Sequence, residues 1–296
     1  MINRAGLGIA CALSAAAMYG FVPNFVRAAY NNGIPPIEST FFRASILALA
    51  FAIIAVLQGE RLRIPKGAGI SFIGQSIATL AVSIGYLASL QFIPVGLAVI
   101  IFFFFPVLIM LTAPIIEGRN PGLLRVLVTA IAFCGLAIAI GPSFETLDVR
   151  GILLATLGSA GAALQFFSGR AISRYMTPSV FGSLVHLAIW PPLLAIALYW
   201  GSGSLQFLPG GSANSTGLVF MCALALVYVV AYMVQMLSLR FAPASTVAPF
   251  YNLEPVVTTG VAATILGERL QSNQYAGGGL VLAALVASSL IGRWRR

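Results

Sequence analysis

A chain of 296 residues with a net charge of +9 at pH 7 has 59% hydrophobic residues and only 8% charged ones. Soluble domains carry about 25% charged residues, so this composition excludes an ordinary soluble domain and indicates a protein built for the lipid bilayer. The positive charge does not indicate a nucleic-acid partner, because the chain has a single lysine, Lys66, and no basic run before its last four residues.

Ten apolar stretches are long enough to cross a bilayer as helices, which takes about 17–25 residues each. In chain order they are residues 6–27, 36–57, 68–91, 94–116, 122–141, 150–173, 178–200, 216–240, 244–266 and 274–292. The first resembles a cleaved signal peptide, but its apolar run continues past the usual length, so we expect it to be retained. The sequence therefore predicts an all-α membrane protein with ten transmembrane helices.

The sixteen cations indicate an orientation in the membrane. If the N-terminus is cytoplasmic, twelve of them fall on cytoplasmic loops and ends, three (Arg27, Arg150 and Arg269) fall on outer loops, and Arg43 lies within a span. Cytoplasmic loops of membrane proteins carry the excess of Lys and Arg. Both termini are therefore expected in the cytoplasm.

Two parts of the chain share one pattern. A shift of 149 residues places Ser238-Leu239, Phe241, Pro243, Pro255 and Val256 on Ser89-Leu90, Phe92, Pro94, Pro106 and Val107. A glutamate, Glu117 or Glu268, follows each copy within about three helical turns. The chain is interpreted as a duplication, with residues 1–143 as the first five-helix repeat and residues 144–296 as the second.

The odd number of spans in each repeat predicts that the second repeat enters the membrane from the opposite side to the first. Such inverted repeats, with helices interrupted by Pro and Gly, are typical of secondary transporters that hold their substrate near the bilayer midplane. The positions expected to break or hinge the helices are Pro106, Pro249 and Pro255.

Several short motifs carry a family resemblance. They are Tyr19-Gly20-Phe21 with Asn24 and Phe25, Arg43, the Pro94 to Pro106 spacing, Leu253-Glu254-Pro255, Gly267-Glu268-Arg269-Leu270 and Gly277–Gly279. With them the chain resembles the drug/metabolite transporter superfamily, in its ten-helix form with two EamA-type repeats. The first repeat departs from the pattern, because Phe105 stands where the Glu would be and Glu117 lacks a preceding Gly.

The resemblance implies export of small metabolites, commonly amino acids, across the inner membrane of a bacterium. The aromatic run Phe102–Phe105 looks most like the aromatic amino-acid exporter branch. A multidrug efflux protein for cationic compounds, with the same architecture, is the main alternative. In either case the partners are a small-molecule substrate and the lipid bilayer.

The third and eighth spans each carry a polar stripe on one helical face. The third has Gln75, Thr79, Ser83 and Tyr86, and the eighth has Tyr228, Tyr232 and Gln235. Two such stripes on symmetry-related helices are what a central water-accessible cavity requires. The alternative is that these hydroxyls and amides bond their own helix or a neighbour, as they often do in membrane bundles.

Three ionisable side chains lie inside the expected spans. Arg43 could bind a substrate carboxylate through its planar guanidinium, or hold a helix by bonding backbone carbonyls. His186, the only histidine, and Glu254, the carboxylate deepest in a span, could carry protons in a coupled exporter. The structural alternatives are a satisfied core group for His186, and for Glu254 a bond to Tyr251 or to backbone groups freed by Pro255.

The complete prediction for the central cavity is a set of polar and aromatic side chains. It comprises Tyr19, Asn24, Arg43, Thr79, Ser83, Tyr86, Phe102, His186, Tyr228, Tyr232, Gln235 and Tyr251. An intramembrane hydrolase would need a base at a recognisable spacing from Ser159 or Ser168, a channel would need rings of charges or carbonyls, and a nucleotide partner would need a P-loop. The sequence shows none of these, so we expect a secondary transporter that works by alternating access, is not an enzyme and needs no cofactor or metal.

Overall fold

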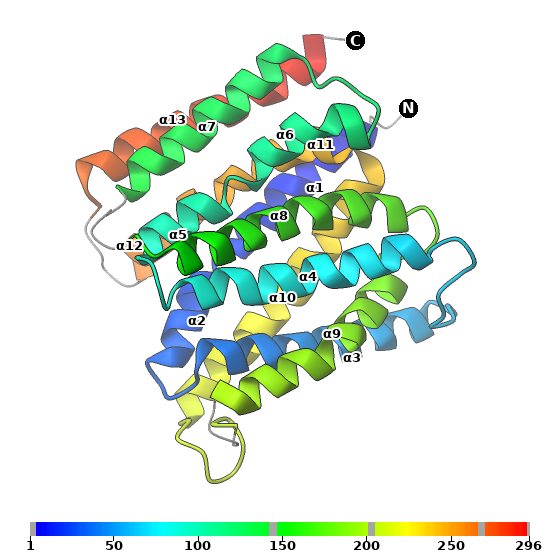
Figure 1. Cartoon of the computed structure of the whole chain (residues 1–296), viewed down its shortest axis with the longest axis vertical. Helices are drawn as coiled ribbons and strands as arrows, with labels where there is room; N and C mark the ends of the chain where they lie inside the picture. The colour runs from blue at the N-terminus through cyan, green and yellow to red at the C-terminus, as the bar shows by residue number, and fades with distance from the viewer. Residues whose placement is uncertain (1–3, 142–146, 201–204, 266–269, 295–296) are drawn as a thin grey trace.

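The computed structural model describes residues 4–141, 147–200, 205–265 and 270–294. Every regular element in those ranges is helical (Figure 1). In chain order the helices are α1 (Arg4–Tyr19), α2 (Val22–Tyr30), α3 (Pro36–Leu57), α4 (Gly69–Ser89), α5 (Val95–Phe102), α6 (Phe105–Ile116), α7 (Leu123–Ile140), α8 (Val149–Ile172), α9 (Pro178–Trp200), α10 (Ser215–Phe241), α11 (Ala244–Val247), the 3-10 helix η1 (Ala248–Asn252), α12 (Leu253–Ile265) and α13 (Ser272–Trp294).

Nine continuous helical stretches in the described ranges are long and apolar enough to cross a membrane. Two of these stretches are pairs of helices that follow each other directly, α1 with α2 and α5 with α6. The expected span at 244–266 is not among the nine, because the chain there is divided into α11, η1 and α12. The protein is a multi-pass, all-helical membrane protein.

Proline residues explain where the second helix of each divided span begins. Pro23 lies in the first turn of α2, Pro106 in the first turn of α6 and Pro249 in the first turn of η1. Proline lacks an N–H group, so it fits the first turn of a new helix, whereas inside a helix it removes a backbone hydrogen bond. Pro255 follows closely as the third residue of α12. These spans therefore have an interrupted backbone well inside the bundle.

The main helix pairs each join the first half of the chain to the second. α4 packs on α8, α7 on α13, α3 on α9 and α1 on α10 (Figure 1). Small residues permit the closest approaches, since a β-carbon at Gly85 would lie 2.8 Å from the backbone nitrogen of Gly158. The largest group of buried hydrophobic side chains lies among these pairs and includes residues of α1, α8, α10 and η1.

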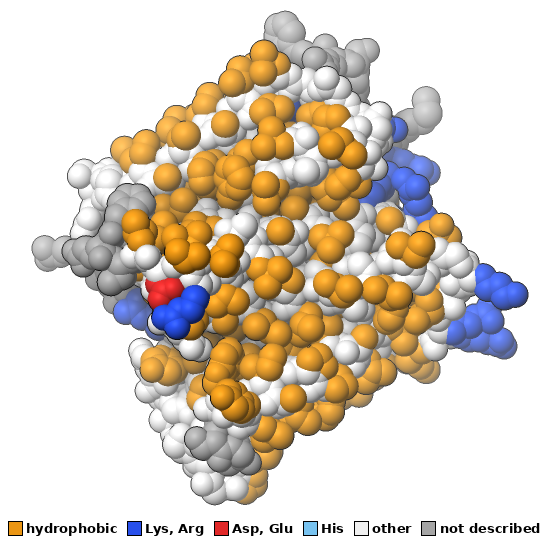
Figure 2. Space-filling model, in the orientation of Figure 1, with side chains coloured by type: hydrophobic (Ala, Val, Ile, Leu, Met, Phe, Trp, Pro, Cys, Tyr) orange, Lys and Arg blue, Asp and Glu red, His pale blue; other side chains and the backbone are white. Residues whose placement is uncertain are grey.

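Two faces of the bundle differ in charge. Figure 2 shows Lys and Arg side chains gathered mainly along the edge where the N-terminus and the α3–α4 and α8–α9 connections lie, whereas hydrophobic side chains cover the side in view. We call this edge the arginine-rich face. The opposite face carries the α2–α3 and α9–α10 connections.

Candidate functional site

The polar stripes of α4 and α10 meet inside the bundle. The Gln75 amide donates a hydrogen bond of 3.3 Å to the Tyr232 hydroxyl, and its oxygen accepts one of 2.6 Å from Ser168 of α8. Gln165, also on α8, donates a hydrogen bond of 3.0 Å to the Thr79 hydroxyl. We call these five side chains the polar network. It joins α4 to a helix pair from the other half of the chain.

A row of aromatic and charged side chains lies beside the polar network. Tyr19, the last residue of α1, donates a hydrogen bond of 2.6 Å to the Gln235 side-chain oxygen. The Tyr19 ring meets the Tyr228 ring edge-on, with centroids 4.9 Å apart. The guanidinium carbon of Arg43 lies 3.9 Å from the centre of the Tyr228 ring, where the ring quadrupole attracts a cation. No carboxylate among the described residues pairs with Arg43.

His186 of α9 packs among the same residues and is only 3% exposed. Its Nδ1 atom lies 2.7 Å from the Gly182 carbonyl oxygen one turn earlier. Its ring lies edge-on to Tyr232, with centroids 4.9 Å apart, and 6.4 Å from Phe51. Arg43 is near enough to act on His186 electrostatically. A buried ring with one nitrogen held by its own helix fits the satisfied core group that the sequence left open for His186.

Glu254 is the second residue of α12 and follows the 3-10 helix η1 directly. Its side chain is half-buried and lies within electrostatic range of the hydroxyls of Tyr19, Tyr86 and Tyr251. No described residue forms an ion pair with it. The suggested bond between Glu254 and Tyr251 is not formed, because the Tyr251 hydroxyl has no hydrogen-bond partner among the described residues. Tyr251 instead packs edge-on against Phe166, with ring centroids 4.8 Å apart.

The remaining predicted residues divide between the interior and helix contacts. Tyr86 and Phe102 pack together with ring centroids 5.2 Å apart, and Ser83 is buried on the same helix as Tyr86. Asn24 of α2 donates a hydrogen bond of 3.2 Å to the Thr258 carbonyl of α12. Asn24 therefore fastens two helices together, which is a different role from lining a cavity.

The residues predicted to line a central cavity differ in how closely they are packed. Tyr232 is 1% exposed and Gln235 is 4% exposed, whereas Arg43, Tyr228 and Glu254 are half-buried. The tightly packed residues are thus the neutral polar ones, and the residues with formal charge keep some open surface.

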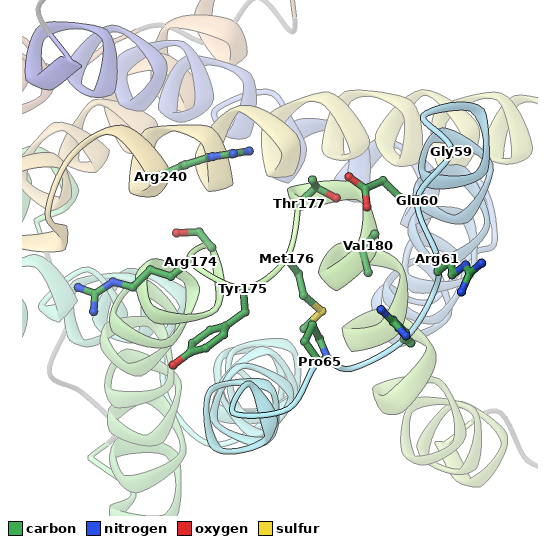
Figure 3. Close-up of a pocket in the computed structure, with 12 residues that line it drawn as sticks. Gly59, Glu60, Arg61, Pro65, Arg174, Tyr175, Met176, Thr177, Val180 and Arg240 are labelled. Carbon is green, nitrogen blue, oxygen red and sulfur yellow. The ribbon is translucent and has the colours of Figure 1, made fainter.

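A cavity of about 490 Å³ opens at the arginine-rich face, and sequence reasoning did not predict it (Figure 3). Its lining comes from the α3–α4 connection, the α8–α9 connection and the end of α10, and consists of Gly59, Glu60, Arg61, Arg63, Pro65, Ser173, Arg174, Tyr175, Met176, Thr177, Val180 and Arg240. We call this cavity the basic vestibule. In the sequence analysis, the arginines that line this cavity were interpreted only as signals of orientation in the membrane.

Two buried or half-buried carboxylates were also given no role by the sequence. Glu38, in the first turn of α3, is 0% exposed, and its Oε2 atom accepts a hydrogen bond of 2.7 Å from the backbone N–H of Gln206. Glu117 accepts hydrogen bonds from the backbone N–H of Ala244 and from the Ser245 hydroxyl. Both carboxylates tie distant connections together. The counterpart Glu268, with Arg269, lies outside the described residues.

Comparison with known proteins gives matches over most of the chain. The profile of the EamA-like transporter family matches twice, at residues 6–141 and 149–290. The threonine/homoserine exporter RhtA of Escherichia coli K12 is 24% identical over 240 residues, covering 80% of this chain and 77% of RhtA. An uncharacterized transporter of Archaeoglobus fulgidus is 25% identical over 262 residues, covering 85% of this chain and 88% of that protein.

A protein of known crystal structure has the same fold. It superposes with a TM-score of 0.80 at 15% sequence identity, covering 96% of this chain and 98% of that one. Among the described residues, no group of three or more His, Cys, Asp or Glu side chains could hold a metal ion. The two profile matches extend over nearly all of the sequence, and the chain belongs to the EamA-like transporter family of the drug/metabolite transporter superfamily.

Proposed function

We propose that the protein is a secondary transporter of the bacterial inner membrane that exports amino acids, aromatic and other neutral ones, together with related small metabolites. The observation that carries this proposal is a pair of ionisable side chains in the bundle, Arg43 and Glu254, neither of which forms an ion pair with a described residue. Ionisable groups in a membrane protein are costly, and those that persist usually mark a substrate or ion pathway.

The chemistry of the row suits a zwitterion. Arg43 offers a planar fork of N–H donors for a carboxylate, and Glu254 offers an acceptor for an ammonium group. Arg43 lies over the Tyr228 ring, Tyr228 contacts Tyr19, and Glu254 is within electrostatic range of the Tyr19 hydroxyl. Aromatic side chains such as Tyr86 and Phe102 would accept an apolar substrate side chain.

The helix contacts support ten spans arranged as inverted repeats at residues 1–143 and 144–296, with α11, η1 and α12 together forming the ninth span. Placing the second repeat on the first relates α1 to α8 and α4 to α10. The contact of α1 with α10 then corresponds to that of α8 with α4, while the pairs α3–α9 and α7–α13 correspond to themselves. A two-fold axis in the membrane plane produces this pattern, and rocking of the repeats about it would give alternating access. The arginine-rich face, with the N-terminus, is then cytoplasmic.

The relatives support the substrate class. RhtA carries the name of a threonine/homoserine exporter and aligns with 80% of this chain. Both threonine and the aromatic amino acids present one carboxylate and one ammonium group, so a site that holds these two groups would accept side chains of different kinds.

The test is flux into liposomes that contain the purified protein, with and without a pH gradient. Labelled Phe, Met and Thr are supplied separately, together with a cationic dye. We expect amino-acid flux that is reduced in Glu254→Gln and in Arg43→Gln. Gradient-driven flux that is lost in Glu254→Gln and kept in His186→Gln assigns proton carriage to Glu254, and the reverse pattern assigns it to His186. Flux that is the same with and without the pH gradient indicates facilitated diffusion without proton coupling.

Efflux of cationic compounds is the second candidate function. Glu254 forms no ion pair with a described residue and lies within electrostatic range of the Tyr19 and Tyr86 hydroxyls. Such a carboxylate would suit a cation with an apolar body, and Arg43 would then have no role in binding. Dye movement without movement of any of the three amino acids overturns amino-acid export and supports this alternative.

A further inference from the structure

The basic vestibule has an excess of positive charge and an open middle. Four arginines and one glutamate line it. Figure 3 shows Arg240 extending along the upper edge from α10, while Arg61 and Arg174 point away from the middle of the cavity. The guanidinium groups of these three labelled arginines therefore leave the middle of the cavity open. An arrangement of this kind acts on a passing anion mainly through its field, since clefts lined by one sign of charge raise the local concentration of the opposite sign.

At the corresponding place on the opposite face, described residues of two connections contact each other. There the α9–α10 connection lies against the α2–α3 connection, and Asn214 bonds Asn32 through its side chain at 2.9 Å and through its backbone N–H at 3.3 Å. The Ser212 hydroxyl donates a hydrogen bond of 3.2 Å to the Gly33 carbonyl. The Phe207 ring packs edge-on against Phe42, with centroids 5.6 Å apart. We call this contact the clasp.

The vestibule and the clasp are made by equivalent parts of the chain. An offset of 143 residues places Pro35, which precedes α3, on Pro178, which begins α9. The connections before α3 and before α9 are thus equivalent, and so are the connections after α3 and after α9. The clasp joins the connection before α3 to the connection after α9. The cavity lies between the equivalent two, the connection after α3 and the connection before α9. Membrane orientation accounts for the arginines, but it does not account for a cavity at the place where, on the opposite face, the equivalent connections are in contact.

The vestibule also leads towards the interior. Arg240 at its edge is eight residues from Tyr232 of the polar network, which is about 12 Å along a helix. Val180 in its lining lies six residues from His186 on α9. A solute in the vestibule is therefore separated from the central residues by about two helical turns.

We propose that the basic vestibule is the mouth through which substrate enters, and that its arginines select solutes bearing a carboxylate. The inference rests on the proposed transport function and adds to it the place of entry and the group that is recognised there. Because Arg61 and Arg174 point away from the middle of the cavity, the vestibule attracts carboxylates without clamping them and releases them readily inwards, and its contribution falls with ionic strength.

The first experiment compares labelled threonine with labelled threonine amide, which lacks the carboxylate, in flux assays that supply solute to the arginine-rich face. Threonine is a zwitterion, so the arginines act on it by attracting its carboxylate end more strongly than they repel its more distant ammonium group. In Arg63→Gln and Arg240→Gln we therefore expect the KM for threonine to rise about twofold to threefold at low salt with the maximal rate kept, because this local attraction is weakened. The difference from wild type should shrink at high salt, and the amide should show no rise in KM. The matched control is Lys66→Gln, which removes one cation from the same connection without lining the cavity. An equal rise in the control, or equal effects on acid and amide, overturns the proposal.

The second experiment does not depend on transport. Thr177→Cys is made in a chain whose three natural cysteines, Cys11, Cys134 and Cys222, are replaced by alanine. An anionic thiol reagent should react faster than a cationic reagent of the same size, and Arg63→Gln should reduce that preference. Equal reaction of the two reagents overturns the proposal, even in a protein that transports threonine. A wild-type protein that moves no amino acid, combined with a Thr177→Cys variant that keeps the anionic preference, instead overturns the proposed function.

Anionic lipid headgroups share the chemistry of the carboxylate and form the remaining arm of the test. The labelling is repeated in liposomes with and without anionic lipid. Labelling of Thr177→Cys that is slowed by added threonine, whatever the lipid, is expected. Labelling that is blocked by anionic lipid and insensitive to threonine shows a lipid site and overturns the assignment as a mouth.

Discussion

The carboxylate of Glu117, which follows α6, accepts a hydrogen bond of 2.7 Å from the backbone N–H of Ala244, the first residue of α11. Its second oxygen accepts from the Ser245 hydroxyl. The first N–H groups of a helix have no partner within the helix, and an anion also suits this end of the helix dipole. Glu117 thus anchors the start of the divided span that leads to Glu254.

Replacing Glu117 by alanine should destabilise the protein by about 1–3 kcal/mol, because charge-assisted hydrogen bonds are lost and a backbone donor is left unpaired. Glu117→Gln should cost less, since an amide oxygen still accepts one bond. The measurement is thermal unfolding in detergent, with the exposed Glu60→Ala as the control. Equal melting temperatures for Glu117→Ala and Glu60→Ala would show that the contact carries no stability.

Arg43→Gln should lower kcat/KM for amino-acid export about tenfold to a hundredfold, because hydrogen bonds to a charged group are worth about 1.5–3 kcal/mol. Arg43→Lys keeps the charge but not the planar fork, and should fall between wild type and Arg43→Gln. Tyr228→Phe keeps the ring under the guanidinium and serves as the control. Full activity in Arg43→Gln would assign Arg43 to structure alone.

Tyr232→Phe tests the polar network with almost no change in volume. It removes the hydroxyl that accepts from the Gln75 amide, which is buried at 0% exposure. An unsatisfied buried donor costs about 1–3 kcal/mol. Tyr199→Phe, at a position that is 83% exposed, should leave the melting temperature unchanged. If Tyr232→Phe and Tyr199→Phe have the same melting temperature, the hydrogen bond between α4 and α10 does not stabilise the packed interior.

The two ends of the Gly277–Gly279 motif should respond differently to substitution. A β-carbon at Gly277 would lie 2.3 Å from the carbonyl oxygen of Gly135, whereas one at Gly279 would meet nothing within 4 Å. Gly277→Val should therefore destabilise the protein by about 1–3 kcal/mol or more through overpacking, and Gly279→Val should not. Comparison of the melting temperatures of the two variants checks this prediction. Similar melting temperatures would show that close packing at Gly277 does not stabilise the α7–α13 contact.

Composition and the lengths of apolar stretches predicted the membrane class and most helix positions, because lipid imposes these on the sequence directly. The residues with functional potential could also be found, since polar side chains such as Gln75, Tyr228 and Glu254 stand out in an apolar span. Their partners could not be found. Gln75 bonds Tyr232 and Ser168 across 157 and 93 residues of sequence, respectively, and nothing local encodes those pairings.

Three sites were missed for identifiable physical reasons. Ser168 lies among small residues, a pattern that indicates close helix packing. Glu38 lies close to the end of an expected span, a position that indicates exposure to solvent. The basic vestibule is formed by connections whose arginines already had an explanation in membrane orientation. In each case the local pattern fitted a simpler role, and only the tertiary arrangement showed the further contact.

The pairing of helices between the two halves has a consequence for synthesis at the membrane. The packing partners of α4, α3, α1 and α7 are α8, α9, α10 and α13, respectively, which are all synthesised later. When the first half of the chain leaves the ribosome, none of these four helix pairs can yet form. Its Gln75 and Thr79 side chains remain in lipid or in the company of the insertion machinery until residues of α8 and α10 arrive. The earliest half of the newborn chain is therefore the part that most needs protection by a chaperone or translocon, and truncated forms ending near residue 143 should be degraded rapidly.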